Sequence, residues 1–144
     1  MKLYTIGFTK TSAEGFFRRL KKAEIRTLVD VRLNNVSQLA GFAKKDDLRY
    51  FTSEIAGASY VHRTELAPTQ ELLDAYKKSG GSWDEYARKF LALMASRRIE
   101  DKLSAEQFDG ACLLCSEDKP HHCHRRLVAE YLRGKWGSFE IVHL

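Results

Sequence analysis

The sequence predicts one α/β domain covering residues 1–144, with a mostly parallel, twisted sheet of about five strands between two layers of helices. Three observations support this fold class. Short β-type runs alternate with amphipathic helical runs along the chain. The runs at 26–31 and 110–115 are almost continuously apolar, which is typical of strands covered on both faces. A length of 144 residues is near the usual size of a single domain.

The first part of the chain is predicted to form a strand, a helix and a second strand. Residues 2–6 make a short apolar strand that ends at Gly7. Thr11 or Ser12 then provides the N-cap of an amphipathic helix. With the strand at 26–31, these elements make a β-α-β unit.

The middle of the chain continues the alternation after an irregular segment. Residues 32–42 are polar and lack periodicity, so we expect a loop of the kind that often acts as a lid or binding segment. A helix at 44–56, a short strand at 59–62 and helices at 71–78 and 83–97 follow. The last of these helices carries an apolar stripe that is predicted to pack in the core: Tyr86, Phe90, Leu91 and Met94.

The last part of the chain contains the most strongly apolar strand. An amphipathic run at 99–108 precedes that strand, 110–115, and a helix at 125–132 and a strand at 139–143 follow it. The sequence contains no internal repeat and no low-complexity segment, in agreement with a single domain.

Composition and cysteine usage predict where the protein works. Hydrophobic residues make up 44% and charged residues 30%, as in ordinary globular proteins. The sequence has neither a signal-peptide pattern nor an apolar run long enough for a membrane span. An odd number of cysteines, Cys112, Cys115 and Cys123, favours free thiols or a metal site over a disulfide framework. We therefore expect a cytoplasmic protein without a membrane partner.

The net charge predicts the sign of the partner's charge. A formal charge of +5 and a pI near 9.2 favour an anionic small molecule or a nucleic acid. A charge of this size is also found in domains that bind no nucleic acid, so it permits such a partner without identifying it.

Polar side chains collect at the predicted carboxyl ends of the strands. In open parallel sheets these ends meet at one edge, and ligands bind there. Each strand that leads into a helix supplies such residues: Thr5 and Gly7, Asp30 and Arg32, His62 and Arg63, and Cys115 and Glu117. The sequence therefore predicts one crevice shared by these positions.

Asp30 and Arg32 have two possible roles. They are two residues apart on a strand, so their side chains should point to the same side, with Val31 opposite. The pair could orient a substrate, or it could be a structural ion pair that organises the loop after Arg32.

The segment from Cys115 to Arg126 carries the densest group of reactive side chains. Pro120 precedes a predicted helix start, and Cys123 and His124 occupy that start. The free N–H groups and the dipole of a helix start attract anions and lower the pKa of a cysteine. Two arginines at the same end, Arg125 and Arg126, add bidentate donors for phosphate.

Four interpretations of this segment remain open from the residues alone. A divalent metal would be bound by Cys115, Cys123 and His124, although their spacing matches no paired zinc-ligand pattern. A thiolate enzyme needs a cysteine beside a base or a cation, which the segment supplies. The third interpretation is simple anion binding, and the fourth places Cys115 in the core with solvated histidines around it.

Several of these residues also form motifs of a known family. The chain resembles the family described as domain of unknown function 488 at Tyr4–Gly7, Leu28–Arg32 with Ser37 and Phe42, Tyr60–His62 with Glu65 and Leu66, Leu113–Glu117, and Cys123–Arg126. The resemblance implies an α/β fold and a shared site at the matching positions, and it brings no activity. Leu33–Val36 and Ala67–Pro68 depart from the family's pattern in the two loops that flank the site. The Asp30–Arg32 motif is also similar to that of rhodaneses, whose short loop from cysteine to arginine is not reproduced here.

We therefore expect an enzyme that acts on a phosphate-bearing substrate, a nucleotide or nucleic acid, at the strand ends. The candidate catalytic residues are Asp30, Cys115, Glu117 and His124. The candidate substrate-binding residues are Thr5, Gly7, Arg32, Ser37, His62, Arg125 and Arg126. One alternative is a cysteine-thiolate or metal-dependent enzyme. Another is a non-catalytic nucleic-acid-binding module with a dispersed basic surface made of Lys21, Lys22, Lys44, Lys45, Arg97 and Arg98.

Overall fold

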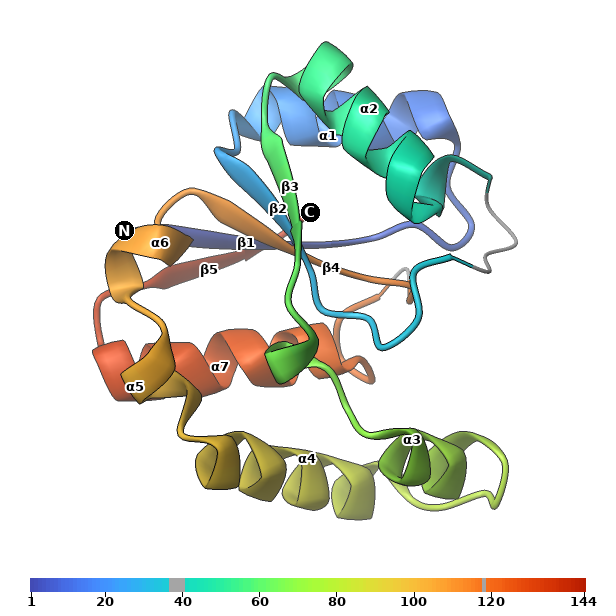
Figure 1. Ribbon diagram of the computed structural model, residues 1–144, viewed down its shortest axis with the longest axis vertical. Helices are drawn as coiled ribbons and strands as arrows, with labels where there is room; N and C mark the ends of the chain where they lie inside the picture. Colours follow the sequence, from blue (N-terminus) through green and yellow to red (C-terminus); the bar gives the residue numbers. More distant parts are fainter. Residues whose placement is uncertain (37–40, 118) are drawn as a thin grey trace.

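The computed structural model, which describes residues 1–36, 41–117 and 119–144, has a central parallel sheet with helices on both faces (Figure 1). The sheet has five strands in the order β3-β2-β4-β1-β5, and every pairing is parallel. The strands are β1 (Lys2–Gly7), β2 (Thr27–Asp30), β3 (Ser59–His62), β4 (Ala111–Cys115) and β5 (Glu140–His143). The predicted three-layer α/β fold is confirmed.

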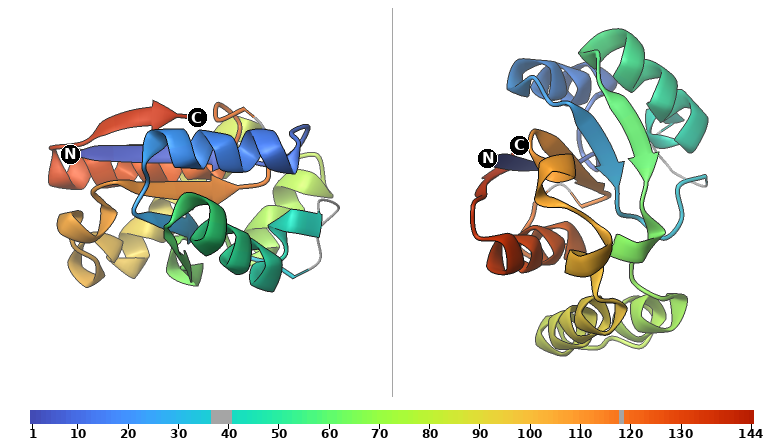
Figure 2. Two further views of the ribbon diagram at one scale, coloured as in Figure 1. Left: turned by 90° about the horizontal axis from the view of Figure 1, so that it is seen from above. Right: turned by 60° about the vertical axis from the view of Figure 1, so that its left-hand side comes forward.

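The helices divide between the two faces of the sheet (Figure 2). Helices α1 (Ala13–Ala23) and α2 (Lys45–Ala56) cover one face, and α7 (His124–Trp136) covers the other. Helices α3 (Gln70–Lys77) and α4 (Trp83–Arg97) lie beyond α7, and α4 packs against it. The shorter helical segments are η1 (Gly41–Ala43), η2 (Thr64–Leu66), α5 (Ile99–Lys102) and α6 (Ala105–Phe108).

The strand order places β4 in the middle of the sheet, between β1 and β2. The first β-α-β unit therefore joins two strands that are not neighbours, because β4 pairs with both of them. Strand β4 is buried along its whole length, as its continuous apolar run predicts. Strand β4 thus lies between two strands that both precede it in the sequence.

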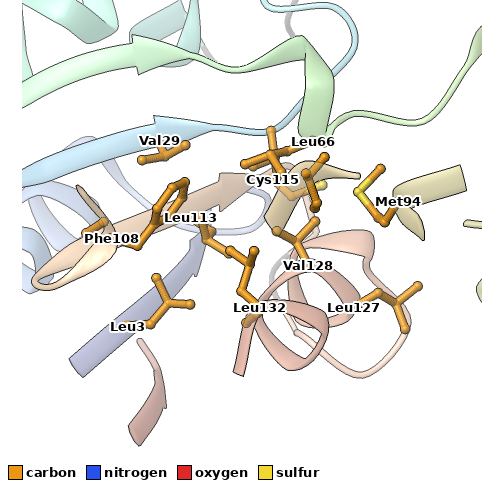
Figure 3. Packing of buried hydrophobic residues seen from close by; sticks show 14 of the residues in the cluster. Leu3, Val29, Leu66, Met94, Phe108, Leu113, Cys115, Leu127, Val128 and Leu132 are labelled. Atoms are coloured by element: carbon orange, nitrogen blue, oxygen red, sulfur yellow. The ribbon is translucent and has the colours of Figure 1, made fainter. Parts of the chain in front are cut away.

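Each face of the sheet has its own hydrophobic core. On the α7 face, Leu113 of β4 packs in a cluster with Val128 and Leu132 (Figure 3). On the α1 face, Leu114 packs in a second cluster with Phe16. The predicted core stripe of α4 is confirmed for Tyr86, Phe90 and Met94, which are buried, while Leu91 is partly buried at the edge of the first cluster.

Local signals in the sequence explain where the main helices begin. The hydroxyl oxygens of Ser12, Thr69 and Ser82 accept hydrogen bonds from backbone N–H groups three residues later, at 3.0, 3.1 and 3.1 Å. These caps start α1, α3 and α4, and Ser12 rather than Thr11 is the cap of α1. Gly57 and Gly137 adopt positive φ where α2 and α7 end.

The connections that leave β2 and β4 run to opposite faces of the sheet. The chain after β2 goes to α2 on one face, and the chain after β4 goes to α7 on the other (Figure 1). Two neighbouring strands with diverging connections leave a crevice at their carboxyl ends. The fold therefore creates a ligand-sized opening beside Arg32 and Cys115.

Among the residues that the structure describes, no helix has the length and hydropathy needed to cross a membrane.

Candidate active site

A cavity of about 350 Å³ lies at this crevice between β2 and β4. Residues 32–34 after β2 form one wall, and residues 115–117 after β4 form another. The rest of the lining comes from the segment 68–86 and from residues 122–124 at the start of α7. The cavity thus combines residues from four parts of the chain that are distant in sequence.

Cys115 and His124 meet at the wall of this cavity. Cys115 is the last residue of β4, and His124 is the first residue of α7. The Cys115 sulfur lies 3.4 Å from Nδ1 of His124. The Nε2 atom of His124 lies 2.7 Å from the carbonyl oxygen of Val31, which can only accept, so Nε2 carries a proton and Nδ1 faces the sulfur. The backbone after β2 therefore orients the imidazole toward Cys115.

Cys123 is the third member of the cluster. It is the N-cap residue of α7, and its thiol hydrogen-bonds to the sulfur of Cys115. The sulfur atoms of Cys115 and Cys123 and a ring nitrogen of His124 all lie within 4.8 Å of one another. All three residues are buried, and all three line the cavity.

The surroundings of Cys115 favour its thiolate form. The hydrogen bond from Cys123 lowers the pKa of Cys115 well below its usual value, against the effect of burial, and the neighbouring His124 lowers it further. Burial is the largest single effect on the pKa of His124 and lowers it, but the negative charge of Cys115 and the hydrogen bonds to Cys115 and Val31 together outweigh it, so the pKa of His124 is raised. By contrast, burial raises the pKa of Cys123, and its hydrogen bond to Cys115 adds to this. Both shifts therefore favour a thiolate at Cys115 and an imidazolium at His124.

The same three side chains could hold a metal ion. Two cysteines and a histidine, with a fourth position open, are a donor set found in catalytic zinc sites. The second ring nitrogen of His124 binds a backbone carbonyl, as the outer nitrogen of a metal-bound histidine usually does. The donor set thus fits a soft divalent ion whose open position would face the cavity.

Asp30 and Arg32 form a buried ion pair beside the cavity. Their side chains point to the same side of β2, and Nε and Nη2 of Arg32 each bind a different carboxylate oxygen of Asp30 at 2.8 Å. The Tyr60 hydroxyl donates to the same carboxylate at 2.6 Å. Arg32 also donates to the carbonyl oxygen of Ala43 at 2.8 Å, so the pair ties β2 to the end of the following loop. This geometry supports the structural interpretation of the pair.

Arg125 is buried beneath the segment after β4. Its guanidinium donates to the carbonyl oxygen of Glu117 and to the hydroxyl of Thr5, and only 1% of its surface is exposed. A side chain on Gly7 would overlap the carbonyl oxygen of Glu117. Thr5, Gly7 and Arg125 therefore fix the path of the backbone after Cys115, and none of them lines the cavity.

The remaining predicted site residues lie in different places. Glu117 lines the cavity and pairs with Lys77 at 3.1 Å. His62 binds the carbonyl oxygen of Arg32 at 2.7 Å and lies on a separate, open groove. Arg126 lies 3.6 Å from a carboxylate oxygen of Glu130 and does not line the cavity. Ser37 is outside the described residues.

The structure thus brings together part of the crevice that the sequence predicts. Arg32, Cys115, Glu117 and His124 line one cavity, while Asp30 lies behind Arg32. The six residues of the expected basic surface are divided between the two sides of the sheet. Lys21 and Lys22 are in α1, while Arg97 and Arg98 are at the end of α4 on the opposite face (Figure 2). Arg97 donates to the carbonyl oxygens of Glu65 and Ala67 at 2.8 and 2.7 Å.

Sequence reasoning missed the outer wall of the cavity. That wall contains aromatic and basic side chains from the end of α3, the start of α4 and the loop before α7: Tyr76, Lys77, Lys78, Trp83, Tyr86 and His122. The rings of Trp83 and His122 stack with centroids 5.0 Å apart, which joins α4 to the segment after β4. The sequence shows an aromatic stripe on α4, but it does not show that one end of this stripe reaches the cavity.

Comparison with known proteins identifies a family and nothing beyond it. No curated protein and no solved structure matches the chain. The model of one family, described as domain of unknown function DUF488, matches residues 12–132, which include β2, β3, β4, the cavity wall and most of α7. The chain therefore belongs to the DUF488 family.

Proposed function

We propose that the protein is a cysteine-dependent enzyme in which the thiolate of Cys115 attacks an electrophilic atom of a substrate bound in the cavity. The observation that carries the proposal is the contact of 3.4 Å between the Cys115 sulfur and Nδ1 of His124 at the cavity wall. A cysteine paired with a histidine in an open cavity is the arrangement that nucleophilic thiol catalysis requires. The direction of both pKa shifts agrees with this role.

His124 would serve the reaction in two ways. As an imidazolium it stabilises the thiolate before attack, and after attack its Nδ1 proton is available to a leaving group. Its Nε2–H group keeps donating a hydrogen bond to the carbonyl oxygen of Val31, which holds the ring in the orientation that both steps need. Asp30, the other acid predicted from the sequence, has no exposed surface and binds Arg32 and Tyr60, so we assign it a structural role.

The outer wall suggests the kind of substrate. Aromatic rings of Tyr76 and Trp83 offer surfaces for a planar or apolar group. Lys77 and Lys78 can bind an anionic group in exchange for the carboxylates of Glu117 and Asp74, with which they pair in this structure. A phosphate-bearing substrate, as expected from the sequence, would therefore contact Lys77 at the end of α3 and Lys78 directly after it. The buried Arg32 and Arg125 would not bind the substrate themselves but would hold the backbone segments after β2 and β4 in place.

The test measures which cysteine reacts in the folded protein. Iodoacetamide labelling followed by peptide mass spectrometry should modify Cys115 at least about tenfold faster than Cys112, which is buried in the other core with its pKa raised by burial. The variant H124N should slow the labelling of Cys115, and the matched variant C112A should leave it unchanged. Equal labelling of the two cysteines, or labelling of Cys115 only in denaturant, would refute the proposal.

The substrate class is tested with the same reaction. Inorganic phosphate and a series of nucleotides are added before iodoacetamide, and an anion that occupies the cavity should protect Cys115. The variant K78A should lose this protection, and the rate at which its Cys115 is labelled without an added anion should equal that of the wild type. Protection that is equal in K78A and wild type would remove the lysine from the substrate site.

A second candidate function is a metal-dependent enzyme, and the fit of the Cys115, Cys123 and His124 donor set favours it. Such a metal would supply a Lewis acid or an activated water at the open position. Elemental analysis of protein purified without chelators should then find one equivalent of zinc or another soft divalent ion, and addition of cobalt should give thiolate-to-cobalt absorption. Metal-free protein that shows no cobalt spectrum would exclude this candidate and leave the thiolate enzyme.

A further inference from the structure

We propose that Cys115 and Cys123 form a redox pair, and that they close to a disulfide when Cys115 reacts with a low-molecular-mass disulfide in the cavity. This inference rests on the nucleophilic role of Cys115 in the proposed function. It adds a second reacting residue, Cys123, as the resolving thiol, and it names the bond that the Cys115 thiolate attacks in a ligand of the cavity, an S–S bond.

The first support is the position of the two sulfur atoms. They lie within 4.8 Å of each other. One residue ends β4 and the other precedes α7, so the loop 116–122 brings them together. A disulfide needs an S–S length of about 2.05 Å, so the two sulfur atoms must move toward each other when the bond forms.

The second support is the residue type at the start of α7. Ser, Thr, Asp and Asn are preferred at the N-cap because their side chains accept a backbone hydrogen bond. Cys123 occupies this position, and its sulfur is a weaker hydrogen-bond acceptor than a hydroxyl or carboxylate oxygen. By comparison, Ser12, Thr69 and Ser82 cap α1, α3 and α4 in the usual way. The start of α7 therefore carries a thiol where an oxygen-bearing side chain is usual, and the sulfur of this thiol lies within 4.8 Å of the Cys115 sulfur.

The third support is access. Both cysteines line the same cavity of about 350 Å³, so a ligand that reaches one sulfur is next to the other. Cys112 differs in each respect, because it belongs to the core on the opposite face of the sheet and does not line the cavity. The three thiols thus divide into one reacting pair and one buried side chain.

The reaction has two steps that balance. The Cys115 thiolate attacks one sulfur of a ligand R–S–S–R, so a Cys115–S–S–R bond forms and R–S⁻ leaves. This R–S⁻ takes the proton of the Cys123 thiol, and the Cys123 sulfur then attacks the Cys115 sulfur and expels the second R–S⁻. The two cysteines lose two electrons, and the ligand gains them as one R–SH and one R–S⁻.

The experiment uses 2-hydroxyethyl disulfide as the probe and C112A as the background, because Cys112 and Cys115 lie in the same peptide after cleavage at Glu117. The reduced, folded protein is mixed with the probe, quenched with acid and measured by intact and peptide mass spectrometry. We expect a loss of two hydrogens and a link between the Cys115 and Cys123 peptides. The variant C112A/C123S should instead keep one mercaptoethanol adduct on Cys115, and C112A/C115S should remain unmodified.

The possible outcomes separate this inference from the proposed function. A stable adduct on Cys115 with Cys123 still present would overturn the redox pair and leave Cys115 as a nucleophile. Reaction with iodoacetamide but not with the disulfide probe would do the same. Failure of Cys115 to react with either reagent would overturn both proposals. Circular dichroism of C112A/C123S serves as the folding control, and serine is a favoured N-cap residue, so α7 should be retained.

Discussion

At the scale of single residues, the buried charges and the reactive thiols have separate roles. Arg32 and Arg125 are both buried and bind protein atoms, so they hold the two backbone segments that form the cavity walls. Cys115 and His124 are also buried, but they contact each other at the cavity wall, whereas Arg32 lines the same cavity with its guanidinium held by Asp30 and Ala43. The arginines predicted to bind the substrate therefore support the residues that would react with it.

The first prediction concerns Gly7. The variant G7A should lose about 1–3 kcal/mol of unfolding free energy, because the added methyl group would overlap the carbonyl oxygen of Glu117 and press on Arg125. The control G134A lies in α7, where an added methyl group meets no atom within 4 Å, so it should be neutral or slightly stabilising. Urea denaturation measures both changes in unfolding free energy. Equal effects of the two variants would show that the close approach of the Glu117 carbonyl does not require a glycine at position 7.

The second prediction concerns the buried ion pair. The variant R32M should lose about 3–5 kcal/mol of unfolding free energy, because it leaves Asp30 charged and buried without its partner. The control R18M breaks an ion pair with the same N–O distance, 2.8 Å, between Arg18 and Glu14. That pair is 75% exposed on both sides, so its loss should be close to undetectable in urea denaturation. A small effect of R32M would mean that Asp30 is not charged.

The third prediction is the pH dependence of Cys115 reactivity. The groups around its sulfur that affect its charge are Cys123, His124 and Arg125, with Lys77 from α3 and Tyr86 from α4. Because the pKa of Cys115 is lowered, the reactive thiolate is present above that pKa and is lost only as the pH falls through it. The rate of iodoacetamide labelling should therefore stay high well below about pH 8.5, the pKa of an ordinary thiol.

The variant H124N provides the comparison for this profile. It keeps a side-chain hydrogen-bonding group and removes the positive charge, so the pH at which the labelling rate is halved should rise. A wild-type midpoint at the value for a free thiol, or an unchanged midpoint in H124N, would show that His124 does not stabilise the thiolate.

At the scale of elements, α4 connects the core to the cavity. Its buried residues Phe90 and Met94 pack in the α7-side cluster, and its first residue, Trp83, stacks on His122 in the loop after β4. The start of α4 therefore holds the outer wall in place. Helix α3 joins the same wall through the contact between the rings of Tyr76 and Trp83, whose centroids are 5.8 Å apart.

The fourth prediction tests the cap of α4. The variant S82A removes the hydroxyl that accepts from the backbone N–H of Glu85, so unfolding free energy should fall by about 0.5–2 kcal/mol. The control S96A is in the same helix, where the hydroxyl only donates to the carbonyl of Leu93, so its effect should be near zero. Urea denaturation of both proteins checks this, and an equal loss would indicate that Ser82 does not act as a cap.

At the scale of the whole molecule, the sequence predicts the fold better than the site. The apolar runs and the helix caps are local, so strands such as β4 and the start of α1 follow from neighbouring residues. The position of β4 between β1 and β2 is not local, because it depends on pairings between distant segments. The sequence likewise predicts a reactive segment from Cys115 to His124, but not the contact of Trp83 with it. The burial of Arg125 depends on Thr5, which is 120 residues away.

The fifth prediction concerns cooperativity across the sheet. Backbone amides of β4 should exchange hydrogen more slowly than those of β5, because β4 is buried throughout and pairs on both sides, whereas β5 is at the edge and partly exposed. Hydrogen exchange followed by mass spectrometry of peptides from the two strands checks this order. Faster exchange in β4 would show that the centre of the sheet opens before its edge.

The division of the cavity into an inner and an outer wall has a consequence for how related chains can differ. The thiol pair and His124 are attached to the centre of the sheet, whereas the segment 68–86 closes the cavity from outside and contributes no strand. Exchange of this segment between two such proteins would change the side chains that a ligand meets first and leave the sulfur atoms where they are. Ligand preference could thus change through the segment 68–86 while the reaction type, set by residues 115–124, stays the same.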